Sequence, residues 1–337
     1  MFCPFLKESL NVFTALILAG KNGILKENGK IKAEEKEDHM RKKLLFIYNP
    51  KAGKAQIRGH LSDIIDIFTK GGYEVTVIPT QAAGEAVSLV KDREEGYEIV
   101  VCSGGDGTLD EVVTGMMQCR NRIPIGYIPA GSTNDFANSL KIPKNMKTAA
   151  KTVVNGRRFP CDAGAFNDDN FVYIAAFGLF TDVSYETKQE TKNVLGHMAY
   201  LLEGMKRIPA IKTFHFKVFH DGEAIEDDFV FGMVTNSVSV GGFKRITGKN
   251  VSLDDGVFEV TLVKMPGNPI ELNEIMVALL NRDIDTEHMY CFKSSEIRFE
   301  SDEEISWTLD GEYGGSHRKV TVRNCEKAIE IIVPEDK

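Results

Sequence analysis

The first part of the chain, from residue 43 to about residue 160, alternates between apolar runs and amphipathic stretches. Short apolar runs are typical of strands buried on both faces of a sheet, whereas apolar residues spaced by three and four predict helices. Strands are predicted at 43–49, 73–80, 97–102 and 123–128, and helices at 55–70, 82–93 and 109–117. This order predicts a doubly wound α/β domain with a parallel sheet, in which ligands bind beyond the carboxyl ends of the strands.

After about residue 165 the pattern changes to short segments rich in β-branched and aromatic residues, separated by turn residues. Examples are FVYIAAFG (171–178), TFHFKVFHDG (213–222) and GVFEVTLVKM (256–265). Such segments predict a mostly antiparallel sheet. Two amphipathic stretches, 193–207 and 269–281, predict helices that interrupt this sheet. We therefore expect a second, β-rich domain.

The first 40 residues continue neither pattern. SLNVFTALILAG (9–20) resembles the apolar part of a signal peptide, and the polar run KENGKIKAEEKEDH (26–39) follows it. Organised sequence begins after Met40, so we expect residues 1–40 to be an extension outside the fold. A start placed too early and a real amphipathic anchor both stay open as explanations. No apolar run in the sequence reaches the roughly 18–20 residues that a membrane-spanning helix needs.

Composition narrows the classes of function. The chain has 337 residues, of which 42% are hydrophobic, so it can bury a core in each of two domains. Its formal net charge of −8 argues against a general nucleic-acid-binding protein, because phosphate contacts need a concentrated basic face. The six cysteines are scattered without a C-x-x-C pair, so the sequence indicates neither a zinc site nor a disulfide framework. We expect a globular enzyme of the cytoplasm.

The third predicted strand runs into the glycine-rich segment GGDGT (104–108). Its glycines permit a tight turn and close approach of a phosphate to the main chain, and the helix that follows would point its first amides at the same place. Asp106 would be unfavourable beside a polyphosphate unless a metal ion lies between them. The segment therefore predicts a site for phosphate and magnesium, although an ordinary strand-to-helix turn is the simpler alternative.

Two other predicted strands end in comparable loops. NPKAG (49–53) follows the first strand, and PAGSTNDFA (129–137) follows the strand that ends at residue 128. Alone, the first reads as a proline turn and the second as a cluster of residues that favour the N-cap position of a helix. Because parallel strands end at one edge of a sheet, we expect all three loops to converge there.

Five segments together resemble the soluble bacterial lipid kinases of the diacylglycerol kinase catalytic-domain group, relatives of the sphingosine and ceramide kinases. The segments are IYNPKAGK, GGDGTLDEVVTG, IPAGSTNDFANSL, LDDG and LDGEY, in this order within residues 41–335. The resemblance implies a NAD-kinase-like N-terminal domain, a β-rich second domain and an active site in the cleft between them. We accordingly expect a nucleotide-binding domain at 41–164, a lipid-substrate domain at 165–326 and a last strand, 327–337, that returns to the first domain.

The resemblance implies transfer of a phosphoryl group from ATP, with Mg²⁺, to the hydroxyl of diacylglycerol, giving phosphatidic acid. Three alternatives stay open: a kinase acting on phosphatidylglycerol or a sphingoid lipid, an NAD kinase, and a nucleotide-binding protein without transfer activity. NAD kinase is the weaker enzymatic alternative, because its next motif after GGDGT is not GSTNDFA. The expected partner is a membrane lipid reached by peripheral contact from the cytosol, and a homodimer is a further option.

The resemblance also assigns the functional residues. Glu312 would be the general base and Asp106 the second catalytic residue, whereas DGE alone would read as a solvated glutamate in a hairpin. A structural magnesium site is implied at the Asp255 side chain and the carbonyls of Ser252 and Val257, with a plain Asp-Gly turn as the alternative. The implied nucleotide-binding residues are Asn49, Pro50, Lys51, Ala52, Gly53, Thr80, Gly104, Gly105, Asp106, Gly107, Thr108, Leu109, Asp110 and Thr133.

The sequence departs from the family pattern in two places. Asp110 stands where the family often has asparagine, and NPKAG carries lysine and alanine where serine or threonine is common. Neither change removes a phosphate-binding amide, but we expect Asp110 to weaken nucleotide binding slightly by adding charge near the phosphates. The basic pairs 206–207 and 244–245 fit either a solvated surface or a patch that docks on lipid.

Overall fold

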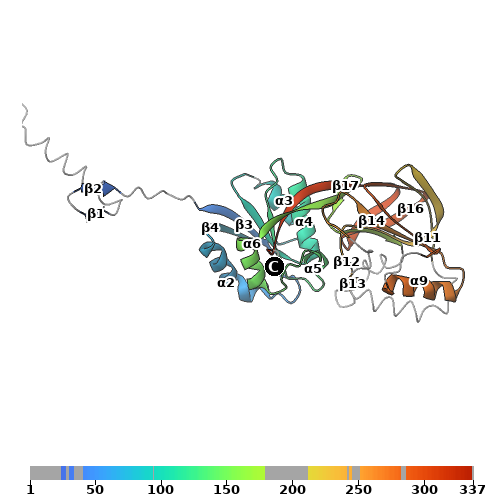
Figure 1. Cartoon of the computed structure of the whole chain (residues 1–337), viewed down its shortest axis with the longest axis horizontal. Coiled ribbons are helices and arrows are strands. Elements are labelled where there is room, and N and C mark those ends of the chain that lie inside the picture. The colour runs from blue at the N-terminus through green and yellow to red at the C-terminus, as the bar shows by residue number, and fades with distance from the viewer. Residues whose placement is uncertain are drawn as a thin grey trace, which may run out of the picture. The chain divides into compact units, whose positions relative to one another are not determined.

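A computed structural model of the protein (Figure 1) describes residues 24–27, 30–33, 41–93, 95–178, 212–240, 243–244, 251–281 and 286–335. The chain divides into two units, 1–41 and 42–337. In the first unit, β1 (Ile24–Glu27) pairs with β2 (Lys30–Ala33) in antiparallel fashion. The helix predicted at 193–207 and the basic pair 206–207 lie outside the described residues.

The second unit begins with four parallel strands, as the alternating pattern predicts. Their order in the sheet is β4 (Tyr73–Pro79), β3 (Lys42–Tyr48), β5 (Ile99–Gly104) and β6 (Ile125–Pro129). Every neighbouring pair is parallel. The loops after β3, β5 and β6 therefore leave the sheet at one edge.

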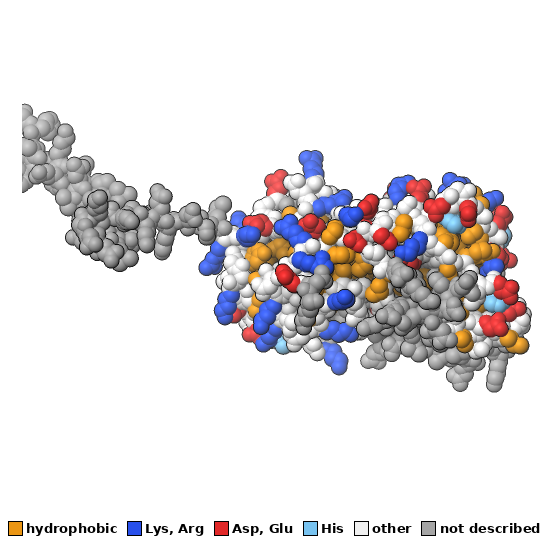
Figure 2. All heavy atoms as spheres, in the orientation of Figure 1, with side chains coloured by type: hydrophobic (Ala, Val, Ile, Leu, Met, Phe, Trp, Pro, Cys, Tyr) orange, Lys and Arg blue, Asp and Glu red, His pale blue; other side chains and the backbone are white. Residues whose placement is uncertain are grey.

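Helices cover both faces of these strands. The helix α2 (Ile57–Lys70) packs against α6 (Met146–Asn155), and α3 (Glu85–Lys91) packs against α4 (Asp106–Met117), with the two pairs on opposite sides of the sheet (Figure 1). A short helix, α5 (Asp135–Ser139), follows β6. Figure 2 shows many Lys and Arg side chains over this part of the molecule, and exposed examples are Lys51, Lys54, Arg58, Lys141 and Lys144.

One boundary differs from the sequence prediction in an informative way. Apolar spacing places the start of the helix after β5 at residue 109, but this helix, α4, begins at Asp106. Apolar spacing reveals a helix only where apolar side chains face the core. The first turn of α4 is instead polar, and it carries an acidic residue, which the helix dipole favours at this end. The GGDGT segment thus supplies the first turn of the helix as well as the preceding loop.

The remaining strands extend the same sheet with antiparallel pairs, so the predicted β-rich part is confirmed. Along the main path the order is β15 (Met289–Ser294), β14 (Phe258–Lys264), β11 (Glu223–Thr235), β10 (Phe214–His220), β16 (Glu296–Leu309) and β17 (Glu312–Val333). Beside this path lie β7 (Arg157–Phe166), β8 (Asp169–Phe171) and β9 (Ile174–Gly178). A separate pair is β12 (Ser239–Val240) with β13 (Phe243–Lys244), and α9 spans Pro269–Asn281 as predicted.

The strand β17 belongs to both parts of the sheet. Its first half pairs with β16, and near its end Ile331 pairs with Ile125 of β6 in parallel fashion. The second half of β17 also pairs with β7, from Val322 to Val333. The chain's last strand therefore joins the parallel strands to the antiparallel ones.

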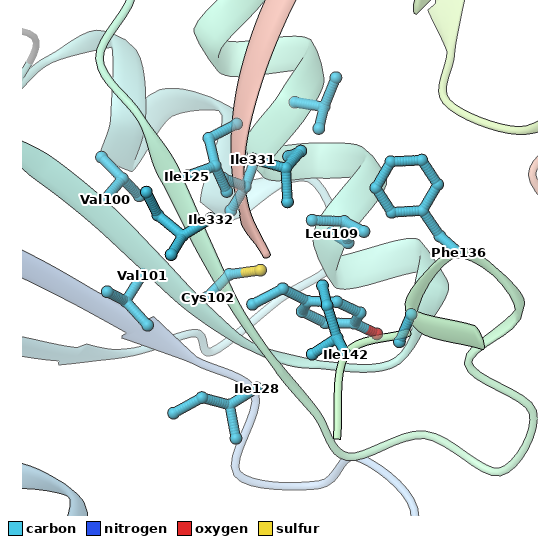
Figure 3. Close-up of a cluster of buried hydrophobic side chains, with 14 of the residues drawn as sticks. Val100, Val101, Cys102, Leu109, Ile125, Ile128, Phe136, Ile142, Ile331 and Ile332 are labelled. Atoms are coloured by element: carbon cyan, nitrogen blue, oxygen red, sulfur yellow. The ribbon is translucent and has the colours of Figure 1, made fainter. Parts of the chain in front are cut away.

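The parallel and the antiparallel part of the sheet each pack on a large cluster of buried side chains. Figure 3 shows Val100 and Cys102 of β5, Leu109 of α4, and Ile331 of β17 in the first cluster. The second cluster is aromatic: the ring centroids of Phe177 and Trp307 are 4.9 Å apart, and Trp307 is fully buried. Burial of one such side chain contributes roughly 1.5–3 kcal/mol. Among the described residues, no helix is long and apolar enough to cross a membrane.

Candidate active site

Close backbone contacts hold the three glycine-containing loops against one another. Gly53 has a φ of +52°, and a Cβ built on it would lie 2.2 Å from the carbonyl oxygen of Ala130. A Cβ on Gly131 would lie 2.7 Å from the Cα of Gly105. Since real Cβ atoms do not approach this closely, both positions need glycine for the loops to meet. The predicted convergence at one edge of the sheet is confirmed.

Hydrogen bonds fix the same arrangement. The amide of Asn49 donates to the carbonyl of Ser103 at 2.8 Å, and the amide of Ala130 donates to the carbonyl of Gly104 at 2.7 Å. The Asn49 side chain donates to the Thr108 hydroxyl at 3.4 Å. Each loop is therefore bonded to the GGDGT segment, which lies between the other two.

The other predicted nucleotide-binding residues lie around these loops, with one exception. Thr80 follows β4, and its amide donates to the carbonyl of Tyr48 at 2.9 Å. Lys51 is exposed, and Thr133 is half-buried in the loop before α5. The Leu109 side chain, in contrast, is 1% exposed and lies in the hydrophobic core, so only its backbone can contact a ligand.

The loop before α5 is not held by an N-cap side chain. Asn134 occupies the cap position with a φ of +53°, but its side chain makes no cap hydrogen bond. Its Oδ1 instead accepts from the amide of Gly131 at 2.9 Å. The Asn134 side chain therefore stabilises the loop and does not cap α5. The simpler interpretation of GSTND as an N-cap cluster is wrong for Asn134.

The N-terminus of α4 carries an acid, Asp106, whose pKa is raised. The cap residue, Gly105, is extended and has no side chain to satisfy the first amides of the helix. The Asp106 Oδ2 accepts from the amide of Asp135 at 3.3 Å, while its Oδ1 is buried without a hydrogen-bond partner among the described residues. Burial, and then the charge of Asp135, raise the pKa of Asp106 to about 6. A cation beside this carboxyl would offset both effects.

Glu312 reaches the same place from the other part of the sheet. It begins β17, directly after the two-residue turn of Asp310 and Gly311, which have φ values of +49° and +89°. Positive φ at both central residues is the mark of the tight hairpin turn that Asp-Gly favours. A Cβ built on Gly107, in the first turn of α4, would lie 3.8 Å from Oε1 of Glu312. The predicted base and the GGDGT segment are neighbours.

Asp310 has a role that the sequence analysis missed. Its buried carboxylate accepts hydrogen bonds from the amides of Val172, Tyr173 and Ile174, the last two at 2.9 Å. These bonds fasten the hairpin to the start of β9. The motif LDGEY marks the turn, but no sequence signal connects Asp310 with amides 136 to 138 positions away.

A second missed group links α5 to the segment before β12. The hydroxyl of Ser239 donates to Oδ1 of Asp135, and the hydroxyls of Ser139 and Ser237 are 2.8 Å apart. The amide of Val238 also donates to the Ser139 hydroxyl at 3.2 Å. Asp135 therefore contacts Asp106 through its backbone and the β-rich part through its side chain.

The predicted structural metal loop, 252–257, is held by protein groups. The Lys293 ammonium lies 3.2 Å from Oδ2 of Asp255 and 2.9 Å from Oε1 of Glu259. Asp162, fully buried, accepts from the amide of Gly256 at 2.8 Å and from the amide of Lys327 at 2.7 Å. Asp255 thus already faces a cation, and the described residues hold no cluster of three or more His, Cys, Asp and Glu side chains suited to a metal.

Two family models and several curated proteins match the chain. The diacylglycerol kinase catalytic domain family matches residues 43–166, and the YegS C-terminal NAD kinase beta sandwich-like domain family matches residues 176–333. The diacylglycerol kinase of Bacillus subtilis (strain 168) is 33% identical over 298 residues, which are 88% of this chain and 98% of the relative. That of Staphylococcus aureus (strain MRSA252) is 33% identical over 300 residues, 88% of this chain and 94% of the relative.

Solved structures share the fold. A diacylglycerol kinase structure from Bacillus anthracis str. Sterne aligns with a TM-score of 0.69 at 23% identity, and covers 88% of this chain and 98% of its own. A second structure from that organism aligns over the same shares with a TM-score of 0.75 at 26% identity. The family matches and the curated relatives confirm the resemblance that the five motifs carry, and they span both parts of the sheet. The chain belongs to the diacylglycerol kinase family.

Proposed function

We propose that the protein is an ATP-dependent lipid kinase that phosphorylates the hydroxyl of diacylglycerol and gives phosphatidic acid. The observation that supports this most directly is the position of Glu312. Its carboxylate lies beside the first turn of α4, next to Gly107 of the GGDGT segment. A phosphate-binding helix start and an exposed carboxylate at one place are what phosphoryl transfer to a hydroxyl needs.

The three loops would hold the nucleotide. The first turn of α4 presents amides that are not capped by a side chain, and Gly53 and Gly131 permit close approach of the main chains. The Oδ1 of Asp106, buried and without a hydrogen-bond partner among the described residues, fits a divalent cation, because a nearby positive charge would satisfy it. Mg²⁺-ATP, when bound, supplies the phosphoryl group and neutralises the charge that moves during transfer.

Glu312 would accept the proton of the lipid hydroxyl. It is exposed at the start of β17, so a substrate can reach it, and the rigid Asp-Gly turn restricts where its carboxylate points. The neighbouring acid, Asp106, would hold the cation that accompanies the nucleotide. Each carboxylate would then have one role. Glu312 would accept the proton of the hydroxyl, and Asp106 would hold the cation that neutralises charge on the phosphates.

The proposal includes finer points of architecture and partners. We place the active site in the cleft between a NAD-kinase-like domain, 41–164 with the returning strand 327–337, and a lipid-substrate domain, 165–326. The lipid would be reached from the cytoplasm by peripheral contact with the inner face of the membrane. Exposed basic side chains in and after the 49–53 loop, such as Lys51 and Lys54, suit an anionic lipid surface. Formation of a homodimer stays a prediction, as does the absence of a nucleic-acid partner.

A kinase assay with a panel of lipids tests the proposal. The purified chain is incubated with radiolabelled ATP, Mg²⁺ and mixed micelles that contain diacylglycerol, phosphatidylglycerol, a sphingoid base or no lipid, with NAD as a soluble acceptor in parallel. We expect label in phosphatidic acid, dependent on diacylglycerol. Label in another lipid or in NAD would show that the substrate is not diacylglycerol. Binding of ATP without any transfer would contradict the enzymatic assignment.

A further inference from the structure

The hairpin that carries Glu312 contains a β-bulge close to its turn. Its register shifts by one residue between the pairs Thr308–Tyr313 and Ser306–Ser316. Two residues of β17, Gly314 and Gly315, therefore lie opposite one residue of β16, Trp307. A bulge bends its strand and increases the local twist. The bend in β17 thus separates Glu312 from the rest of the strand.

A second hairpin of this chain has the same kind of turn without a bulge. The strands β10 and β11 are joined by Asp221 and Gly222, whose φ values of +46° and +83° are close to the +49° and +89° of Asp310 and Gly311. Pairing of β10 with β11 continues without a shift along the whole of β10. The turn therefore does not account for the bulge beside Glu312. Bulges are frequent next to active sites, where they change the direction of a side chain.

The bulge is held by a histidine and needs a glycine. The Nε2 atom of His317 lies 2.9 Å from the carbonyl oxygen of Gly314, and Nε2 must carry the hydrogen of this bond because a carbonyl only accepts. The His317 ring also packs against the buried ring of Phe166, with centroids 5.6 Å apart. Gly315 has a φ of +90°, and a Cβ built on it would lie 2.6 Å from Nε2 of His317. A larger residue at 315 would therefore disturb the bond that holds the bulge.

Hydroxyl groups connect the residues on the two sides of the bulge. The Ser316 hydroxyl lies 2.9 Å from that of Ser306 on the neighbouring strand. It also lies 2.8 Å from the hydroxyl of Tyr313, the residue directly after Glu312. The segment next to Glu312 is thus tied to the part of β17 beyond the bend.

We propose that the Gly314–Gly315 bulge places the carboxylate of Glu312 beside the first turn of α4, and that His317 is a positioning residue that keeps the bulge in shape. Glu312 comes two residues before the bulge, and its Oε1 lies 3.8 Å from a Cβ built on Gly107. At the other side of Glu312, Asp310 fastens the turn to β9. The catalytic consequence rests on the proposed function of Glu312 as the base.

Deletion of Gly315 tests the bulge itself. With one residue fewer, β17 can pair with β16 without a shift, while the turn and the pair Leu309–Glu312 stay the same, so we expect the variant to fold. At saturating Mg²⁺-ATP and lipid, kcat should fall by about 10²-fold, the cost of a misplacement of about 1 Å. The Kd for Mg²⁺-ATP should stay nearly constant, because the three glycine-containing loops are unchanged. A kcat within about threefold of the parent would overturn the proposal.

Gly315→Ala is a milder change with a matched control, Gly222→Ala. Both add a methyl group at a glycine with positive φ, so both should lower Tm by a similar amount. Only at Gly315 would the added Cβ meet Nε2 of His317, whereas at Gly222 nothing lies within 4 Å. We expect kcat to fall by about tenfold for Gly315→Ala and to stay constant for Gly222→Ala. Equal kcat values for the two variants would contradict a link between the bulge and the base.

Two substitutions test His317. His317→Phe keeps a ring that can pack on Phe166 but removes the donor, whereas His317→Gln supplies an amide that can donate to the carbonyl of Gly314. We expect His317→Phe to lower kcat by about tenfold at constant Kd for Mg²⁺-ATP, and His317→Gln to recover most of the loss. A parental kcat for His317→Phe would show that His317 does not position the base.

A double-variant cycle separates this inference from the proposed function. If the bulge acts through Glu312, deletion of Gly315 should lower kcat little further in a Glu312→Gln protein, whose base is already absent. An equal loss with and without Glu312 would refute the inference and leave the proposed base intact. A near-parental kcat of Glu312→Gln alone would overturn the proposed base, and the catalytic consequence of the bulge with it.

Crystal structures of the parent and of the variant without Gly315 test the placement without any substrate. We expect the end of the hairpin to move away from α4 in the variant, with the Glu312 carboxylate farther from Gly107 than in the parent. An unmoved carboxylate would show that the bulge does not place Glu312, whichever lipid the enzyme phosphorylates.

Discussion

The two parts of the sheet position their functional groups by different means. In the parallel part, three loops approach so closely that Gly53 and Gly131 leave no room for a Cβ, and backbone hydrogen bonds complete the contact. In the antiparallel part, a single carboxylate, Glu312, is placed by a hairpin whose turn residue is tied to distant strands through its side chain. In the proposed function, phosphate binding would thus depend on small residues in sequence-local loops, whereas placement of the base would depend on buried polar contacts between distant segments.

Because of this difference, we expect substitutions in the two parts of the sheet to impair different steps of the reaction. A side chain added to a glycine loop should impair nucleotide binding, because it separates main chains that must converge. Loss of a buried polar contact around the hairpin should impair the chemical step, because the carboxylate moves while the loops remain in place. Changes at the point where the two parts meet should be the most damaging.

Asp106 lies at that meeting point, so Asp106→Ala should have the largest effect. It removes the carboxylate that we propose to hold the cation of the nucleotide, and we expect kcat to fall by about 10³-fold, the upper range for loss of one electrostatic stabiliser. The comparison variant is Asp66→Ala, whose exposed ion pair with Lys70 contributes little. Steady-state kinetics and circular dichroism are measured for both. Near-normal turnover by a folded Asp106→Ala protein would exclude Asp106 from the active site.

Gly53→Val tests the parallel part by itself. The added Cβ would collide with the carbonyl of Ala130 at a position with positive φ, so the 49–53 loop must move away from the 129–134 loop. We expect KM for ATP to rise by more than about tenfold, with a smaller change in kcat, because nucleotide binding is lost and Glu312 is not displaced. Gly59→Val on α2 is the control, since a Cβ there meets nothing within 4 Å. An unchanged KM would show that convergence of the loops is not needed.

Lys293→Met tests the antiparallel part at the loop of Asp255, with the smallest expected effect. The ammonium faces the buried Glu259 as well as Asp255, so its loss leaves a carboxylate without its cation and should destabilise the fold by about 1–3 kcal/mol. At about 2–4 °C per kcal/mol, Tm should fall by several degrees. Lys319→Met, at a position 74% exposed, should change Tm little.

The same variant sharpens the prediction of a structural magnesium ion at 252–257. If Asp255 binds Mg²⁺, millimolar MgCl₂ should raise Tm of Lys293→Met more than that of the parent, because the competing ammonium is gone. If neither protein responds to MgCl₂ or to EDTA, the loop is held by Lys293 and Asp162 without a metal, and the magnesium prediction at Ser252, Asp255 and Val257 is wrong.

Sequence patterns predict the parallel part well because its determinants are local. Apolar runs and helical spacing lie within single segments, and the glycines of GGDGT occur next to the strand that they follow. The start of α4 at Asp106 is the exception, since a polar first turn leaves no apolar pattern to detect. The placement of the loops at one edge follows from the parallel order of the strands.

The contacts that place Glu312 could not be predicted in the same way. Asp310 bonds to the amides of Val172, Tyr173 and Ile174, which lie 136 to 138 positions away, so no local pattern carries this pairing. The Ser239–Asp135 bond has the same character. The partners of these buried polar groups can be identified only once the fold has brought the distant segments together. The motif LDGEY identifies the right residues, but the reason for its aspartate appears only in the structure.

The central claim is that Glu312 accepts the proton of the lipid hydroxyl, and Glu312→Gln tests it most directly. Glutamine keeps the size and hydrogen bonding of the side chain but removes its basicity. At saturating Mg²⁺-ATP and diacylglycerol, we predict that kcat falls by about 10²- to 10⁴-fold, while Tm and the Kd for Mg²⁺-ATP stay nearly constant. A kcat within about threefold of the parent would mean that another group is the base, and the proposed division of roles between the two parts of the sheet would fail.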